Sequence, residues 1–164
     1  MTVQEKLNTY SFFDGAILSH GFTSYIRDYE IVVEASAWYN KDGAGRYSYC
    51  FTHCVHANYN TNVRDDTWRI SWSDTYTDYE GWKEAGEPEG KVWGVSWAGA
   101  YPGLTYLENS EVAHDWSQRL GRAMHEVRIE TEVYWLNLVF YDVVIRKIGG
   151  ETPILDRVNI PIEP

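Results

Sequence analysis

The sequence predicts an α+β domain that is mainly antiparallel β-sheet, with one helix at the N-terminus and a second near residues 110–121. Apolar residues recur every three or four positions in those two segments, whereas they alternate with polar residues in most of the others. The chain has 164 residues, of which 44% are hydrophobic and 23% charged, and we find no repeat or linker in it. This composition predicts a single globular domain over residues 1–164.

The first helix is predicted to begin after Thr2 and to reach about His20. Thr2 and Glu5 have the spacing of a capping box, in which each side chain bonds to the other residue's backbone N–H. Gly21 would end the helix. The apolar residues that share one helical face are Val3, Leu7, Tyr10, Phe13 and Ile17.

Extended strands are predicted from residue 29 onward. Residues 29–37 alternate between apolar and polar side chains, and Asp42-Gly43 supplies a turn. Residues 46–63 alternate again, and we expect them to be the partner strand of a hairpin. Residues 64–72 fit a helix and a strand equally well, so their conformation is left open, whereas residues 91–97 have strand character.

The second half of the chain is predicted to hold a helix followed by a hairpin. A change of direction is expected at Tyr101-Pro102-Gly103. Ser110 can cap the helix, Gly121 can end it, and the expected buried stripe is Val112, Trp116 and Leu120. Residues 125–133 and the long extended run 135–147 should form an antiparallel hairpin. The three prolines after Gly150 predict an edge or surface arm over residues 151–164.

Charge and composition narrow the classes of function. Fourteen Lys and Arg residues against 24 Asp and Glu give a net charge of −10, which disfavours general nucleic-acid binding. The sequence shows no signal peptide or membrane span, because its most apolar stretch is interrupted by Asn137, Asp142 and Arg146. Two cysteines without a secretory signal suggest a cytoplasmic protein with free thiols. We expect no cofactor.

Residues 73–90 are the most unusual segment, because six carboxylates and one lysine gather there. One interpretation is a loop that keeps the chain soluble. The other is a recognition surface in which aromatic side chains anchor a basic protein partner within a negative field. The candidate partner-binding residues are Asp74, Asp78, Tyr79, Glu80, Trp82, Glu84, Glu87 and Glu89.

An alternative is a small hydrolase or ligand-binding pocket. Imidazoles titrate near neutral pH and guanidinium binds oxyanions in a bidentate manner, so the candidates are His20, Arg27, Asp28, His53 and His125. The structural interpretation has Arg27 and Asp28 bonding the backbone where a helix meets a strand, with His20 capping that helix. No GxSxG, HExxH, Walker-type or GxGxxG motif is present, so no residue is assigned as catalytic and an enzyme is the less favoured reading.

A metal site is not expected, although suitable side chains cluster near residue 50. Cys50, His53, Cys54 and His56 are zinc-ligand types. In a strand, however, His53 and Cys54 point to opposite faces, so one strand cannot gather all four ligands. Small buried thiols are the simpler prediction.

Two further groups of side chains have a functional and a structural interpretation. Glu126, Glu130 and Glu132 could hold a cation, but Arg128 among them favours a solvated outer face. The eight tryptophans could line an aromatic small-molecule site. Those expected in the core are Trp93, Trp97, Trp116 and Trp135, and those expected to be exposed are Trp38, Trp72 and Trp82.

Four segments between about residues 10 and 148 follow one another as FFDGAILSHGFTSYIRDYEIVVE, FTHCVHA, GKVWGVSWAGAYPG and VAHDWSQRLGRAMHEVRIETEVYWLNLVF. In this order they resemble the YxiG-like family of small bacterial proteins, which has no established reaction or ligand. Some relatives are encoded near secreted toxins, so the resemblance implies an immunity or toxin-neutralising role. Glu132 stands where the family usually has asparagine, which affects where the hairpin turn is placed. The leading prediction is therefore a non-enzymatic cytosolic protein that binds and inhibits a basic partner.

Overall fold

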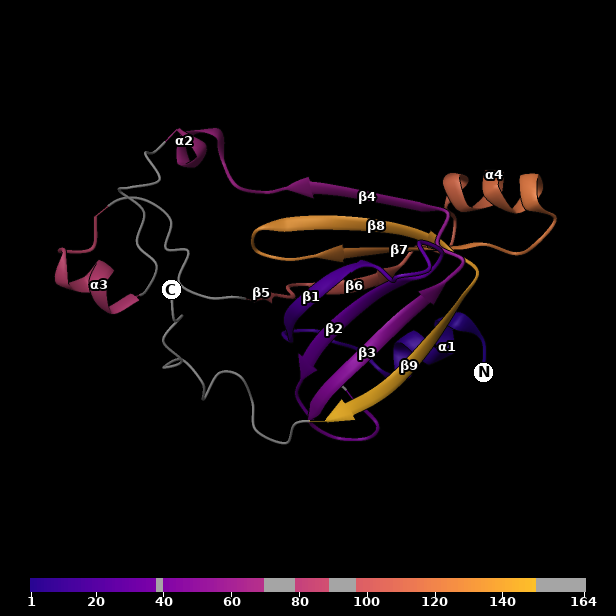
Figure 1. Cartoon of the computed structure of the whole chain (residues 1–164), viewed down its shortest axis with the longest axis horizontal. Helices are drawn as coiled ribbons and strands as arrows, with labels where there is room; N and C mark the ends of the chain where they lie inside the picture. The colour runs from indigo at the N-terminus through magenta and orange to yellow at the C-terminus, as the bar shows by residue number, and fades with distance from the viewer. Residues whose placement is uncertain (38–39, 70–78, 89–96, 150–164) are drawn as a thin grey trace.

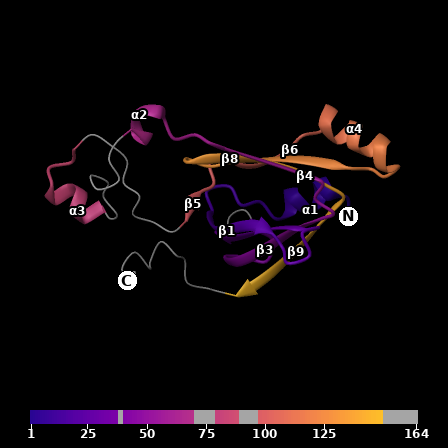
Figure 2. The same ribbon diagram turned by 45° about the horizontal axis from the view of Figure 1, so that its top comes forward.

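Two antiparallel sheets pack face to face, with a short helix at one end of the layer between them (Figures 1 and 2). The computed structural model describes residues 1–37, 40–69, 79–88 and 97–149. The five-stranded sheet has the order β5-β1-β2-β3-β9, and the four-stranded sheet has the order β4-β8-β7-β6. Every pairing between neighbouring strands is antiparallel. The predicted α+β class with mainly antiparallel sheet is therefore confirmed.

The bounds of the strands and helices follow the chain order. The five-stranded sheet contains β1 (Ala16–Phe22), β2 (Tyr29–Ala35), β3 (Gly45–Thr52), β5 (Ala98–Gly99) and β9 (Asp142–Gly149). The four-stranded sheet contains β4 (His56–Thr61), β6 (Gly103–Tyr106), β7 (His125–Glu130) and β8 (Tyr134–Phe140). The helices are α1 (Val3–Thr9), α2 (Asp65–Trp68), α3 (Tyr79–Glu84) and α4 (Glu111–Leu120).

The N-terminal helix is shorter than predicted. The Thr2–Glu5 capping box is present, and Val3 and Leu7 are buried as expected. The helix ends at Thr9, however, and the segment predicted as its second half is the strand β1. The cause lies at Gly15, where an added Cβ would stand 3.0 Å from the carbonyl oxygens of Glu34 and Phe12. The chain must therefore turn tightly there, and helical spacing beyond it is coincidental.

The chain passes between the two sheets at two neighbouring points, which the periodicity did not reveal. The run predicted as one strand over residues 46–63 breaks after Thr52, and β4 continues in the other sheet. The extended run 135–147 likewise changes sheet at Tyr141, between β8 and β9. The two crossings adjoin, because the Tyr141 N–H donates to the Thr52 carbonyl at 2.9 Å. The predicted hairpin of residues 125–133 and 135–147 is confirmed for β7 and β8.

Helix α4 forms where predicted but buries a different face. Ser110 accepts a hydrogen bond from the Ala113 N–H at 2.9 Å, and Gly121 ends the helix at φ 62°. The stripe predicted to be buried is largely exposed, with Val112 at 42% and Leu120 at 46%. Ala113 is buried instead, in a cluster with Met124 and Val139. A small residue lets the helix approach the four-stranded sheet closely, and periodicity could not indicate which sheet would be met.

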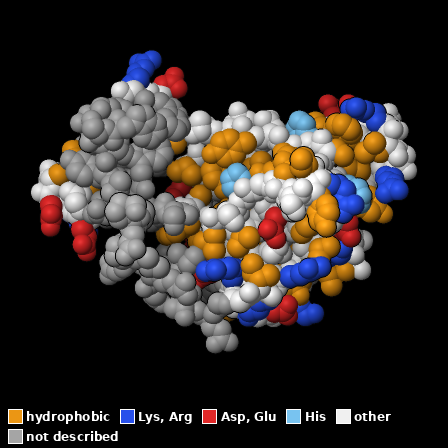
Figure 3. Space-filling model, in the orientation of Figure 1, with side chains coloured by type: hydrophobic (Ala, Val, Ile, Leu, Met, Phe, Trp, Pro, Cys, Tyr) orange, Lys and Arg blue, Asp and Glu red, His pale blue; other side chains and the backbone are white. Residues whose placement is uncertain are grey.

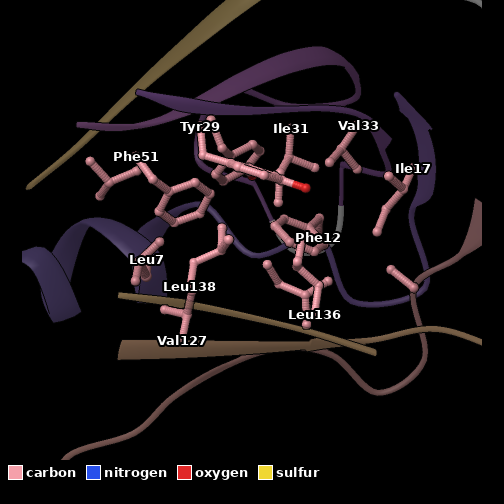
Figure 4. Close-up of a cluster of buried hydrophobic side chains, with 14 of the residues drawn as sticks. Leu7, Phe12, Ile17, Tyr29, Ile31, Val33, Phe51, Val127, Leu136 and Leu138 are labelled. Carbon is pink, nitrogen blue, oxygen red and sulfur yellow. The ribbon is translucent and has the colours of Figure 1, made fainter. Parts of the chain in front are cut away.

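The core lies between the sheets and is built from tyrosine, phenylalanine and aliphatic residues (Figure 4). Phe51 of β3 packs edge-on against Phe140 of β8, with ring centroids 4.8 Å apart, and this contact joins the two layers. Residues with no exposed surface include Phe12, Ile31, Val33, Tyr47, Tyr49, Phe51, Val127, Ile129, Leu138 and Phe140. The core is thus shared by both sheets.

The tryptophans do not supply this core. Trp97, Trp116 and Trp135, which were expected inside it, are only half-buried. The Arg119 guanidinium lies 3.9 Å from the Trp116 ring centroid, and the Arg128 guanidinium lies 5.3 Å from that of Trp135. Surface rings covered by cations in this way retain much of their contact area without entering the core. Trp38, Trp72 and Trp93 lie outside the described residues.

The helices α2 and α3 lie beyond one end of the sheet pair (Figure 1). Helix α2 supplies a conformation for part of the segment left open by the sequence, and α3 falls inside the segment expected to be a loop. The strand predicted over residues 91–97 and the arm predicted over residues 151–164 lie almost wholly outside the part of the chain that is described. None of the helices described is both long and apolar enough to cross a membrane.

Candidate functional site

The acidic segment presents exposed carboxylates on and just after α3. Glu80 and Glu84 are one helical turn apart on the short helix, Glu87 follows it, and all three are exposed. We call Glu80, Glu84 and Glu87 the α3 surface, and its acidic side chains stand at the far left of Figure 3. Within the described ranges, no lysine or arginine forms an ion pair with any of the three. Their negative charge is therefore directed at solvent.

Trp82 is the aromatic member of this segment, and it is half-buried. Its indole N–H donates to the Pro88 carbonyl at 2.9 Å, and the Glu87 N–H donates to the Trp82 carbonyl at 3.0 Å. The side chain thus holds the turn that follows α3 against the helix. Of the other predicted partner-binding residues, Tyr79 begins α3, whereas Asp74, Asp78 and Glu89 lie outside the described residues.

Arg27, Asp28 and His53, three of the alternative candidates, come together at the crossing after β3. The Arg27 guanidinium donates to both Asp28 carboxylate oxygens, at 3.1 Å each. Asp28 is 9% exposed and also accepts from the His53 backbone N–H at 2.9 Å. The hydrogen bond from Arg27 is the main reason that the pKa of Asp28 lies below its usual value. His53 itself has φ 48°, a left-handed conformation that this bond helps to hold.

His20 belongs to a different cluster. It lies in β1 and not at a helix end, so the predicted capping role is wrong. Its Nδ1 lies 2.7 Å from the Tyr29 hydroxyl, and its ring stacks on Tyr59 and meets Tyr134 at a tilt. Burial lowers the pKa of His20. The cluster joins the two sheets, because β1 and β2 belong to one and β4 and β8 to the other.

His125 lines a polar cavity beneath the start of α4. Its Nδ1 lies 2.8 Å from the Tyr106 hydroxyl, its ring meets Phe140, and burial lowers its pKa. The cavity, which we call the α4 cavity, has a volume of about 170 Å³. A wider recess of about 440 Å³ shares Glu108, Ser110 and His114 with it. Neither concavity has a lysine or arginine in its lining.

Glu126 is the residue of this cavity that the sequence placed wrongly. A solvated outer face was predicted for it, yet it is only 5% exposed. One carboxylate oxygen accepts from the Asn137 amide at 2.8 Å, and the other accepts from the Ser110 hydroxyl. The alternation correctly separated its face from that of Val127, but α4 covers that face. The signal that could have indicated this is Asn137, a polar residue opposite Arg128 on the neighbouring strand.

The three candidate imidazoles occupy separate surroundings. His53 meets the Tyr141 ring, His20 meets the tyrosine cluster, and His125 meets Tyr106. In the described portion, none of the three has another as a hydrogen-bond or ring partner. The pairing of two histidines at one point, which acid–base chemistry would need, is therefore not among the observed contacts.

The cysteines and nearby histidines fall on both sides of the crossing. Cys50 is half-buried in β3, whereas Cys54 is buried and its thiol donates to the His56 carbonyl at 3.3 Å. Burial raises the pKa of Cys54 to about 12. Across the described ranges, no group of three or more His, Cys, Asp or Glu residues is placed to hold a metal ion.

Comparison with known proteins relates the chain to one family. The family model described as YxiG-like protein matches residues 1–155. None of the curated proteins matches the chain. A crystal structure of an uncharacterized protein from Neisseria gonorrhoeae is similar at a TM-score of 0.42 and 7% identity, over 84% of this chain and 95% of that one. A likeness of this size carries no argument about function.

Proposed function

The chain belongs to the YxiG-like family, and on this premise we propose that it is a non-enzymatic cytosolic binding protein whose acidic α3 surface recognises a basic protein and inhibits it, as an immunity protein does. The observation that carries the proposal is the exposure of Glu80, Glu84 and Glu87 with no described cation paired to any of them. Unpaired exposed carboxylates keep their full attraction for a positive partner.

The charge of the whole chain supports the same partner class. A net charge of −10 repels anionic surfaces and draws a cationic protein from a distance of about one Debye length, roughly 8 Å at physiological salt. Residues 73–90 carry half of that charge. Binding of this kind is fast and falls as salt is added.

The experiment is copurification with basic secreted proteins at low and high salt. The variant Glu80→Gln/Glu84→Gln/Glu87→Gln should lose capture of the partner at low salt. The matched control is Glu108→Gln/Glu111→Gln/Asp115→Asn, which removes the same number of charges from the recess beside α4. The control should retain the partner. If both variants bind equally well, the α3 surface is not the binding site.

A second candidate function is ligand binding, and the α4 cavity favours it. The cavity offers the carboxylate of Glu126 and the side chains of Ser110, His114 and His125, with no basic residue in its lining. This chemistry suits a small polar molecule that carries a positive charge. A thermal-shift screen with small amines and guanidinium compounds tests it. Equal shifts in the parent and in Glu126→Gln would place any binding elsewhere.

A further inference from the structure

The edges of the two sheets differ in how well they are protected from pairing with another strand. Within the described chain, the edge strands are β5 and β9 in one sheet and β4 and β6 in the other. Strand β5 has two residues and β6 has four, and β9 carries Asp142, Arg146 and Lys147. Short length and charge both discourage strand addition.

Strand β4 has neither protection. It has six residues, His56–Thr61, with no Asp, Glu, Lys, Arg or Pro among them. Its register with β8 runs without a shift from His56 to Thr61. In the view of Figure 1, it forms the upper edge of the four-stranded sheet. A regular, uncharged edge of this length is a template for a further strand.

The hydrogen-bond pattern shows which backbone groups of β4 are available. The Asn62 N–H donates to the Val133 carbonyl at 2.8 Å, which continues the β4–β8 register by one pair. Hydrogen-bonded and non-hydrogen-bonded pairs alternate in an antiparallel ladder, so Asn60 and Asn58 also face β8. The N–H and C=O groups of Ala57, Tyr59 and Thr61 therefore point away from the sheet.

The side chains on this edge are suited to contact. Tyr59 is 54% exposed, although its ring stacks on His20 with centroids 5.8 Å apart and meets Tyr134 at 5.0 Å. The ring is thus held in place while half of its surface remains open. Asn58 and Thr61 are also exposed.

We propose that two copies of this chain associate through β4, with the two strands antiparallel about a two-fold axis at Tyr59. Tyr59 then faces its own copy, and Ala57 faces Thr61 of the second chain. This register pairs every outward-pointing N–H and C=O of the three residues and joins the four-stranded sheets into one continuous sheet. It also places the two Tyr59 rings side by side, as a cross-strand aromatic pair.

Charge selects a second copy over a basic protein segment as the occupant. Two chains of net charge −10 repel each other, so they can approach closely only where neither presents a carboxylate, and β4 is such a place. A basic segment would find no carboxylate along β4 to pair with. This inference is independent of the proposed function, and the two respond to salt in opposite ways.

The test is sedimentation analysis of the full chain from low micromolar to several hundred micromolar, at low and high salt. The parent should form dimers that are strengthened by salt, because salt screens the repulsion. Tyr59→Pro removes one outward N–H without removing a bond to β8 and should abolish the dimer. Tyr59→Ala keeps the N–H and should weaken the dimer only in part.

A second variant does not depend on tolerance of proline. Asn58→Asp keeps the oxygen that accepts from the Asn60 amide at 3.1 Å, but it introduces like charges at the contact. Dimerisation should weaken by about tenfold. Monomers at every concentration and salt would overturn the proposal and leave β4 to a strand from a different protein. So would a dimer unaffected by Tyr59→Pro or Asn58→Asp, or one lost as completely in Tyr59→Ala as in Tyr59→Pro.

Discussion

The carboxylate of Asp28 accepts the backbone N–H of His53 at 2.9 Å, at the point where the chain leaves the five-stranded sheet for the four-stranded sheet. The Arg27 carbonyl accepts the next N–H, that of Cys54, at 2.8 Å. The loop before β2 therefore carries the backbone of the crossing. The polar residues that suggested a catalytic pocket satisfy backbone groups that the change of sheet would leave unpaired.

Replacing Asp28 should therefore cost stability. Asp28→Ala removes the acceptor of a mostly buried N–H and should lower the free energy of unfolding by about 1–3 kcal/mol. Asp28→Asn keeps an oxygen for His53 but loses the charge opposite Arg27, so its cost should be smaller. Urea unfolding followed by circular dichroism measures both. Glu87→Gln, an exposed change, is the control and should unfold like the parent.

The same carboxylate predicts a loss of stability in acid. Because the folded pKa of Asp28 is below its ordinary value of 3.8, this contribution is complete above that pH and disappears as the pH falls through the depressed pKa. Stability should drop below about pH 4 by less in Asp28→Asn than in the parent. Urea midpoints at a series of pH values test this, and equal slopes for the two proteins would argue against it.

The N-cap of α4 and a buried carboxylate should act as a unit. Ser110 accepts from Ala113 and donates to Glu126, so one hydroxyl links the helix to β7. Ser110→Ala should destabilise the fold by about 1 kcal/mol. Combined with Glu126→Gln, the total should be less than the sum of the single effects. Unfolding free energies of the two single variants and the double variant give the coupling, and strict additivity would contradict the link.

The two thiols should react slowly in the folded protein. Burial raises the pKa of both, that of Cys54 to about 12, and only the thiolate is nucleophilic. At pH 8 a disulfide reagent should modify Cys50 slowly and Cys54 more slowly still, and both should react quickly in denaturant. Cys50→Ser and Cys54→Ser separate the two rates. Rapid native labelling of Cys54 would show that the crossing opens.

The sequence predicted elements well where a local signal is complete. Thr2 with Glu5, and Ser110 with Gly121, specify helix ends by bonds within a few residues, and both helices begin where expected. Alternation likewise identified the buried faces of β2 and β3, with Ile31, Val33, Tyr47, Tyr49 and Phe51 inside. These patterns depend only on neighbours along the chain.

The errors arise where a distant segment decides the outcome. Gly15 is close to the carbonyl of Glu34, and Thr52 binds Tyr141, so neither the end of α1 nor the change of sheet after β3 can be found from periodicity. Glu126 looks solvent-facing until α4 covers it. The candidate site followed the same rule. The exposed acids were found from local charge, whereas the α4 cavity depends on tertiary packing.

The histidine cluster between the sheets should give a second, milder pH dependence. Burial lowers the pKa of His20 from 6.5, so between the lowered pKa and 6.5 the unfolded chain holds more protons than the folded one. This contribution is complete above pH 6.5 and is lost as the pH falls through the lowered pKa. The free energy of unfolding should therefore decrease from pH 7.5 to pH 5.5. His20→Phe retains a ring against Tyr59 and Tyr134 but cannot titrate, so its decrease should be smaller. NMR titration of the His20 ring in the folded chain gives the pKa directly, and a value at or above 6.5 would contradict the prediction.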